Sequence, residues 1–221
     1  MQLSHRQKEI IKSARIGITG SPGTGKKSVG LELARLTGLK FISLNEVAIK
    51  NRIGRWKDGE FLVDISKLRR KKIETRGKII VGHLLPYVIP ASNLDFVAIL
   101  RCSPNVLKKR YSSRGYSRSK TEENLEAELL GIISFKALQA YGRSKVGEFD
   151  TTRTRNPVRT ALLILKTMLG ERSKRYGIEK WSTGAAKSPN RLLAAVRAVE
   201  SPRPEGKKIT RLPASKKLRT K

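Results

Sequence analysis

Short apolar runs alternate with helix-like periodicities along residues 14–170 of this chain. The short runs predict strands around Ile16 and Ile18 and at residues 40–43, 78–81, 95–101 and 146–150. Apolar spacing and polar caps predict helices at residues 29–37, 44–50, 64–75, 103–113, 121–141 and 156–169. Strands that alternate with helices indicate an α/β fold, with a parallel sheet covered on both faces and ligands at the carboxyl ends of its strands.

Some of these predictions rest on particular residues. The helix after residue 28 should bury one face and stop at Gly38, and helix 121–141 should do the same with a longer apolar stripe. Near the N-terminus a short amphipathic helix is expected from three apolar positions. The apolar residues are Val29, Leu31, Leu33, Ala34 and Leu36 in the first case, Leu125, Leu129, Ile132 and Leu138 in the second, and Leu3, Ile10 and Ile11 in the third.

The character of the chain changes after Gly170, where turn-forming residues become frequent. One helix is expected at residues 189–200 with Ser188 as its cap, and disorder is expected from Pro202 onward. We therefore predict two parts: a folded α/β domain at residues 1–170 and a basic, partly disordered extension at residues 171–221.

The net charge of +30 comes from 48 Lys and Arg against 18 Asp and Glu. The extension carries 15 basic and 4 acidic residues, a net of +11, and the remaining +19 belongs to residues 1–170. The electrostatic field of so much positive charge attracts polyanions, which favours RNA or a ribosomal surface as a partner. A merely well-solvated surface is the alternative.

The remaining composition excludes several classes of protein. No apolar run is long enough to span a membrane, and residues 1–13 lack the apolar core of a signal peptide. Cys102 is the single cysteine, which rules out an internal disulfide and fits a reducing cytoplasm. With only His5 and His83, the chain cannot assemble a zinc site at the usual spacings, and we predict no metal held by side chains.

A glycine-rich loop follows the first predicted strand and reads Gly-Ser-Pro-Gly-Thr-Gly-Lys over residues 20–26. Glycines such as Gly23 and Gly25 let successive N–H groups converge on one phosphate, and the helix N-terminus behind them adds positive potential. Lys26 stands where a P-loop lysine reaches the β- and γ-phosphates. A glycine-rich turn with no ligand is the alternative, but the order of strand, loop and helix favours a nucleotide phosphate site.

One position departs from that pattern. Ser or Thr should follow Gly-Lys and bind magnesium through its hydroxyl, whereas this chain has Lys27, with Ser28 one place later. A second candidate residue for the phosphate site is Arg114, which begins an Arg-Gly-Tyr-Ser stretch between two predicted helices. Such a loop can close over a nucleotide and stabilise the transferred phosphoryl group, although an ordinary helix C-cap would look the same.

Taken together, the motifs resemble adenylate kinase isoenzyme 6, the ribosome-assembly adenylate kinase-like NTPase family of archaea and eukaryotes. The resemblance covers residues 14–170 in order, leaves the basic extension outside, and suggests an archaeal-like member. Its motifs are the loop at 20–26, Phe-Ile-Ser-Leu-Asn-Glu from Phe41, Leu-Val-Asp from Leu62, Gly82-His83, Leu-Arg-Cys-Ser-Pro-Asn-Val-Leu from Leu100, Arg-Gly-Tyr-Ser from Arg114 and Glu-Asn-Leu-Glu-Ala-Glu from Glu123.

This resemblance implies a nucleoside monophosphate kinase-like P-loop fold, with an NMP-binding segment at residues 43–66 and a lid at 113–123. It implies the reaction of ATP with AMP to give two ADP, or ATP hydrolysis, with Mg²⁺ as the usual metal. It also implies partners in small-subunit maturation: a ribosomal protein of the small-subunit platform, and rRNA or the pre-ribosome. By the same resemblance the ATP-binding residues are Gly23, Gly25, Lys26, Lys27, Ser28 and Arg114, with Lys26, Arg114 and His83 as the catalytic ones.

The family has an acidic residue, any residue and then His at the end of the third strand, and here this triplet is Val81-Gly82-His83. Both expected magnesium ligands are therefore replaced, by Val81 and Lys27, which weakens metal-assisted transfer. His83 is retained, although it could be a strand-end histidine satisfied by backbone contacts. Two functions remain open from the sequence: an adenylate kinase-like enzyme, and a non-catalytic, nucleotide-binding assembly factor that binds RNA.

Overall fold

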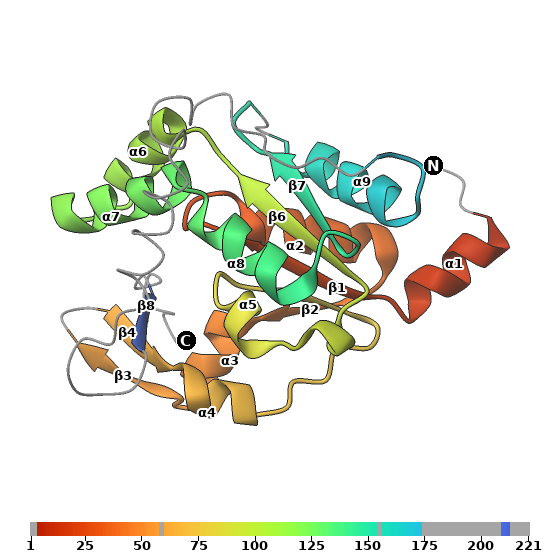
Figure 1. Ribbon diagram of the computed structural model, residues 1–221, viewed down its shortest axis with the longest axis horizontal. Helices are drawn as coiled ribbons and strands as arrows, with labels where there is room; N and C mark the ends of the chain where they lie inside the picture. Colours follow the sequence, from red (N-terminus) through yellow and green to blue (C-terminus); the bar gives the residue numbers. More distant parts are fainter. Residues whose placement is uncertain (1–3, 58–59, 154–155, 174–208, 213–221) are drawn as a thin grey trace, which may run out of the picture.

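A parallel five-stranded sheet organises the chain, in the order β2-β5-β1-β6-β7. The computed structural model describes residues 4–57, 60–153, 156–173 and 209–212. The sheet runs across the centre of the molecule in Figure 1. Its strands are β1 (Arg15–Gly20), β2 (Lys40–Ser43), β5 (Lys78–Val81), β6 (Phe96–Arg101) and β7 (Val146–Asp150). The α/β fold and all five strands predicted from the sequence are confirmed.

Helices cover both faces of this sheet. On one face, α2 (Lys26–Thr37) and α9 (Pro157–Met168) pack over alternate residues of β1 and β6, and α1 (His5–Lys12) adds its single buried residue, Ile11. On the other face, α5 (Leu85–Val88) and α8 (Ile132–Tyr141) pack over the remaining alternate residues, and α3 (Leu44–Lys50) and α4 (Ile65–Arg70) extend the same core. A short 3₁₀ helix at Ala91–Asn93 follows α5.

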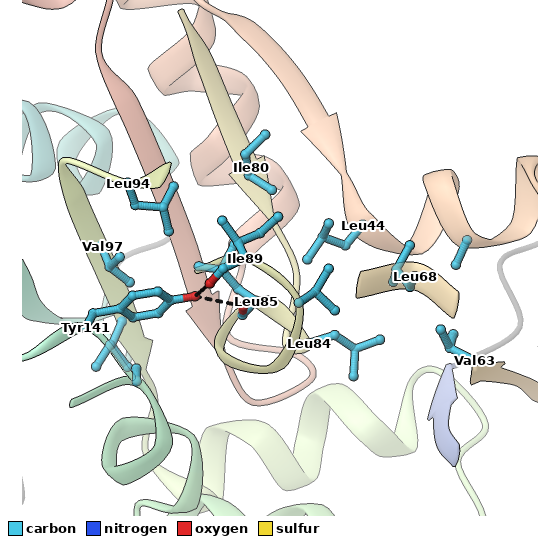
Figure 2. Packing of buried hydrophobic residues seen from close by; sticks show 14 of the residues in the cluster. Leu44, Val63, Leu68, Ile80, Leu84, Leu85, Ile89, Leu94, Val97 and Tyr141 are labelled. Atoms are coloured by element: carbon cyan, nitrogen blue, oxygen red, sulfur yellow. Dashed lines mark hydrogen bonds between the residues drawn. The ribbon is translucent and has the colours of Figure 1, made fainter. Parts of the chain in front are cut away.

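Tyr141 links two of the helices, α8 and α5, that cover this second face of the sheet. Its hydroxyl donates to the carbonyls of Leu85 and Ile89 at 2.7 and 3.1 Å, as Figure 2 shows, so α8 is tied to the end of α5. The same figure shows the apolar cluster continuing past Leu84 toward Leu68 of α4 and toward Val63, which lies in the expected NMP-binding segment at residues 43–66. That segment is therefore anchored to the central core by buried side chains.

A second, antiparallel sheet consists of β3 (Gly54–Lys57), β4 (Glu60–Asp64) and β8 (Ile209–Leu212), in that order. It was not expected. The sequence analysis predicted disorder from Pro202 onward, and this is wrong for residues 209–212, whose backbone pairs with β4. An open edge strand accepts a further strand readily, and Ile-Thr at 209–210 favours extended backbone.

Three helix predictions need correction. The helix expected at 64–75 begins after its cap Asp64 but ends at Arg70, because Lys72 takes a positive φ of 47°. The helix expected at 121–141 is two helices, α7 (Arg118–Leu129) and α8, because Gly131 adopts a φ of +64° between them. In α2, Leu31 points away from the apolar stripe and is 46% exposed.

The other helices are confirmed within a few residues, including α6 (Pro104–Ser112), α9 and α1 with its exposed Ile10. The helix expected at 189–200 lies outside the described residues, and so does Leu3. Among the residues described, no helix combines the length and apolarity that crossing a bilayer requires. The division at residue 170 stays a prediction.

Candidate phosphate-binding site

The glycine-rich loop joins the end of β1 to the start of α2 at the carboxyl edge of the sheet. Gly25 caps α2 with a left-handed backbone, at a φ of +91°, and Gly23 has a φ of +80°. A Cβ on Gly23 would also lie 2.9 Å from the ring of Tyr111. Both positions therefore favour glycine, and the loop they form ends at the N-terminus of the 12-residue helix α2, which attracts anions.

Lys26 lies at the centre of this loop. Its Nζ donates to the carbonyls of Gly20 and Ser21, both at 2.8 Å. Burial lowers the pKa of Lys26 to about 7; the Glu128 carboxylate opposes this shift, and the positive charge of Arg114 adds to it. A phosphate brought to the loop would replace the two carbonyls as partners and stabilise the ammonium form.

Glu128 supports the loop from behind and was missed by the sequence analysis. This buried carboxylate accepts from Ser21 Oγ at 2.6 Å, from Arg101 Nε at 2.9 Å and from the backbone N–H of Cys102 at 3.0 Å. A signal was present, because Glu128 stands three residues after Leu125 and four before Ile132, on the predicted apolar stripe. A charge on such a stripe indicates a buried, paired group.

Helix α6 holds the outer side of the loop. Arg110 donates to the Gly23 carbonyl at 2.7 Å, and the Tyr111 hydroxyl donates to the Pro22 carbonyl at 2.7 Å. Neither residue was predicted to belong to the site. Two backbone carbonyls of the loop are thereby held by side chains of α6.

Arg114 follows α6 in an exposed turn, where its backbone N–H donates to the Tyr111 carbonyl at 3.0 Å. Its charge helps to lower the pKa of Lys26, so the two cations act on the same region. Within the described part of the chain, Arg114 has no ion-pair partner. The guanidinium is thus available to an anion at the loop.

His83 lies just after β5, beside the loop. Burial and, secondly, the charge of Lys26 lower the pKa of His83 to about 3, so its imidazole is neutral at pH 7. The structure thus brings the neighbourhoods of Lys26, Arg114 and His83 together at one edge of the sheet. Whether each one binds or transfers phosphate stays a prediction.

Magnesium fits the residues of this site poorly. Lys27 Nζ forms an exposed ion pair with Glu46 Oε1 at 2.8 Å, Ser28 is exposed on the first turn of α2, and Val81 is buried in the core. An ammonium and an isopropyl group stand where P-loop proteins place a hydroxyl and a carboxylate, so no oxygen ligand comes from either position. The described residues also hold no group of three His, Cys, Asp or Glu side chains that could bind a metal.

The expected lid contacts the expected NMP-binding segment. Lys120, in the first turn of α7, pairs with Glu60 at the start of β4 and lies 4.4 Å from the ring centroid of Tyr116. Tyr116 in turn stacks on Tyr111, with centroids 5.1 Å apart. In Figure 1 these elements, α6, α7 and the β3–β4 hairpin, lie together on the left of the sheet. A ligand at the loop would have both segments beside it.

Comparison with the sequences of known proteins gives two findings, a family model and a set of relatives. A family model described as "AAA domain" matches residues 16–131. A "Putative adenylate kinase" of Thermococcus gammatolerans is 35% identical over 170 residues, covering 76% of this chain and 92% of the relative. One of Methanocaldococcus jannaschii is 31% identical over 175 residues, covering 76% and 93%.

One result concerns solved structures. A shikimate kinase from Acinetobacter baumannii in complex with shikimate is 18% identical, with a TM-score of 0.49, over 76% of this chain and 99% of that one.

Proposed function

Since the chain belongs to the AAA domain family and to the adenylate kinase-like phosphotransferases represented by these archaeal relatives, we propose that it transfers the γ-phosphoryl group of ATP to AMP. The products are two ADP, and water can replace AMP as acceptor. The observation that carries the proposal is that Lys26, the first residue of α2 after the glycine-rich loop, lies near enough to Arg114 for their charges to interact.

In the proposed reaction the loop amides and Lys26 bind the β- and γ-phosphates of ATP. A phosphate oxygen of AMP attacks the γ-phosphorus, and the bond to the β,γ-bridging oxygen breaks. Charge spread over the transferred group is stabilised by fixed cations, here Lys26 and Arg114. The neutral imidazole of His83 offers one donor and one acceptor to an oxygen of the phosphates or to the attacking water.

AMP is proposed to bind between the phosphate loop and residues 43–66. Helix α3 begins there, at the carboxyl end of β2, with Ser43 as its cap. The buried Asn45 Oδ1 has no hydrogen-bond partner in the described structure, and a nucleotide amino group would supply the missing donor. The pairing of Lys120 with Glu60 would close the lid over this space.

The proposed cellular setting is maturation of the small ribosomal subunit, with a platform ribosomal protein and rRNA or the pre-ribosome as partners. Two observations support it: the motifs shared with adenylate kinase isoenzyme 6, and the net charge of +30, which favours polyanionic partners. A coprecipitation of the full chain with small-subunit precursors tests this setting separately from the reaction.

The reaction is tested by following ADP formation from ATP with and without AMP, in the wild type, in Arg114→Ala and in Arg118→Ala. Both arginines are exposed, and Arg118 pairs only locally with Glu122, which makes it a matched control. An arginine that stabilises the transferred group contributes about 10³-fold or more to the rate. The rate of ADP formation should therefore fall by that order in Arg114→Ala and stay near the wild-type rate in Arg118→Ala.

Two outcomes would contradict this proposal. If AMP does not increase the rate of ADP formation, transfer to AMP is contradicted and the protein is an ATPase only. Binding of ATP with no ADP formed under any condition would leave a nucleotide-binding assembly factor.

A further inference from the structure

A second basic site lies at the opposite edge of the central sheet, where β2 and β5 begin. A pocket of about 420 Å³ is formed there by α1, the end of α2, and the first residues of the two strands. In Figure 1 helix α1 lies on the right, away from α6 and α7 on the left. The pocket therefore cannot be part of the nucleotide site at the carboxyl edge.

The pocket carries far more positive than negative charge. It is lined by five cations, Lys8, Lys12, Lys40, Arg76 and Lys78, and by a single carboxylate, Glu74. Glu74 is already engaged, since Lys78 Nζ donates to it at 2.6 Å and the backbone N–H of Arg76 donates at 2.8 Å. The hydrogen bond from Lys78 lowers the pKa of Glu74, so this carboxylate stays ionised and neutralises one cation only.

The other four cations have no ion-pair partner among the residues described. Lys8, Lys12, Lys40 and Arg76 are all exposed. Like charges held around one cavity repel one another, and an anion in the cavity removes that repulsion. The arrangement therefore favours an anionic occupant.

The floor of the pocket is apolar. Ile11 and Leu39 are buried there, and Leu36 is partly buried. An apolar floor with a cationic rim suits a nucleotide unit, whose base and sugar contact the floor while its phosphate reaches the rim.

A further run of cations continues from the rim. Residues 67–72 end α4 and precede Glu74, and their five basic side chains are exposed and make no ion pair with a described residue. Three residues separate Lys72 from Arg76, so their Cα atoms lie at most about 14 Å apart. Together with the four cations of the pocket, these five side chains carry more positive charge than the phosphate of one nucleotide can neutralise, whereas a strand with repeated phosphates can neutralise more of it. The five are Lys67, Arg69, Arg70, Lys71 and Lys72.

We propose that this pocket and the run at residues 67–72 form one surface that binds the sugar–phosphate backbone of single-stranded nucleic acid. The surface neutralises phosphates and reads no sequence. This inference rests on the proposed association with RNA and names the face of the folded domain that makes it. It does not depend on phosphoryl transfer.

The test measures binding of a labelled oligouridylate to the full chain at several salt concentrations, with a non-hydrolysable ATP analogue occupying the nucleotide site. The variant is Lys12→Glu/Lys40→Glu. Its matched control is Lys108→Glu/Lys109→Glu, which makes the same change of net charge with two exposed lysines of α6 at the other edge. All four side chains are exposed, so both proteins should fold, and circular dichroism checks this.

Each phosphate contact contributes about −0.7 to the log–log salt slope on a single strand, so the pocket variant should lose about 1.4 from the magnitude of its slope. The control should keep the wild-type slope, and ADP formation should be unchanged in the pocket variant. An equal decrease of the salt slope in both double variants would overturn the assignment of this surface while leaving RNA association intact.

Three other results would also count against the surface. A full chain that binds no oligouridylate would overturn the RNA association as well. Displacement of the strand by uridine monophosphate at equal phosphate concentration would mean a small organic phosphate site. Equal displacement by polyglutamate would mean that any acidic polymer suffices.

Discussion

Glu128 accepts a hydrogen bond from Ser21 Oγ at 2.6 Å, across 107 residues of sequence, and so joins the end of α7 to the phosphate loop. The same carboxylate pairs with the buried Arg101 at the end of β6. Helix α7 begins at the expected lid, where Lys120 pairs with Glu60. One helix therefore connects the lid, the floor of the loop and the central sheet.

The Glu128→Gln variant should be strongly destabilised. It leaves the Arg101 guanidinium with less compensating charge in the interior, and breaking a buried pair typically costs about 3–5 kcal/mol. Urea denaturation followed by circular dichroism measures the free energy of unfolding. Glu122→Gln, in the exposed pair with Arg118, is the control and should change it by about 1 kcal/mol or less. Similar values for the two variants would mean that the buried network adds little.

Lys26→Ala should weaken ATP binding. The variant removes a charge-assisted contact worth about 1.5–3 kcal/mol, which is roughly tenfold or more in affinity. Titration calorimetry measures this, with Lys166→Ala, an exposed lysine on α9, as control. An unchanged ATP affinity in Lys26→Ala would refute the assignment of Lys26.

ATP affinity should depend on pH near neutrality. The pKa of Lys26 is about 7 in the free protein, and a bound phosphate raises it by favouring the ammonium. The contact is therefore fully present below pH 7 and is lost as the pH rises through 7 toward the pKa of the complex. Calorimetry at pH 8 in buffers of different ionisation enthalpy should detect proton uptake on binding, and Lys26→Ala should abolish that uptake. Uptake that persists in the variant would point to another group.

Nucleotide binding should depend unusually little on Mg²⁺. The Lys27 ammonium can turn from Glu46 to the phosphates and partly replace the charge of a metal, because its present ion pair is exposed and weak. Lys27→Thr alone should not restore full metal dependence, since Val81 still offers no oxygen, whereas Lys27→Thr with Val81→Asp should come closer to it. ATP titrations with and without EDTA test this, and loss of wild-type binding in EDTA would contradict it.

The central fold was predictable because its signals are local. The strand around Ile16 and Ile18, the loop and the helix stop at Gly38 each follow from a few adjacent residues. The β3–β4 hairpin was predictable in principle, because Asp58-Gly59 between the apolar residues Trp56 and Phe61 is a hairpin signal.

Other features could not be obtained from local patterns. The position of Glu128 beneath Ser21 and the pairing of β8 with β4 both join segments more than 100 residues apart. The break at Gly131 depends on a left-handed backbone that the continuous apolar stripe of residues 125–138 conceals. In each case tertiary contacts decide between conformations that the local sequence permits.

The pairing of β8 with β4 ties residues 209–212 of the basic extension to the hairpin of β3 and β4. Backbone hydrogen bonds along four registered residues make the hairpin of β3 and β4 and the strand at 209–212 move as one body. If the hairpin shifts when a nucleotide enters, the paired strand, which belongs to the basic extension, shifts with it. Nucleotide binding at the carboxyl edge of the central sheet would then displace positive charge that belongs to the basic extension.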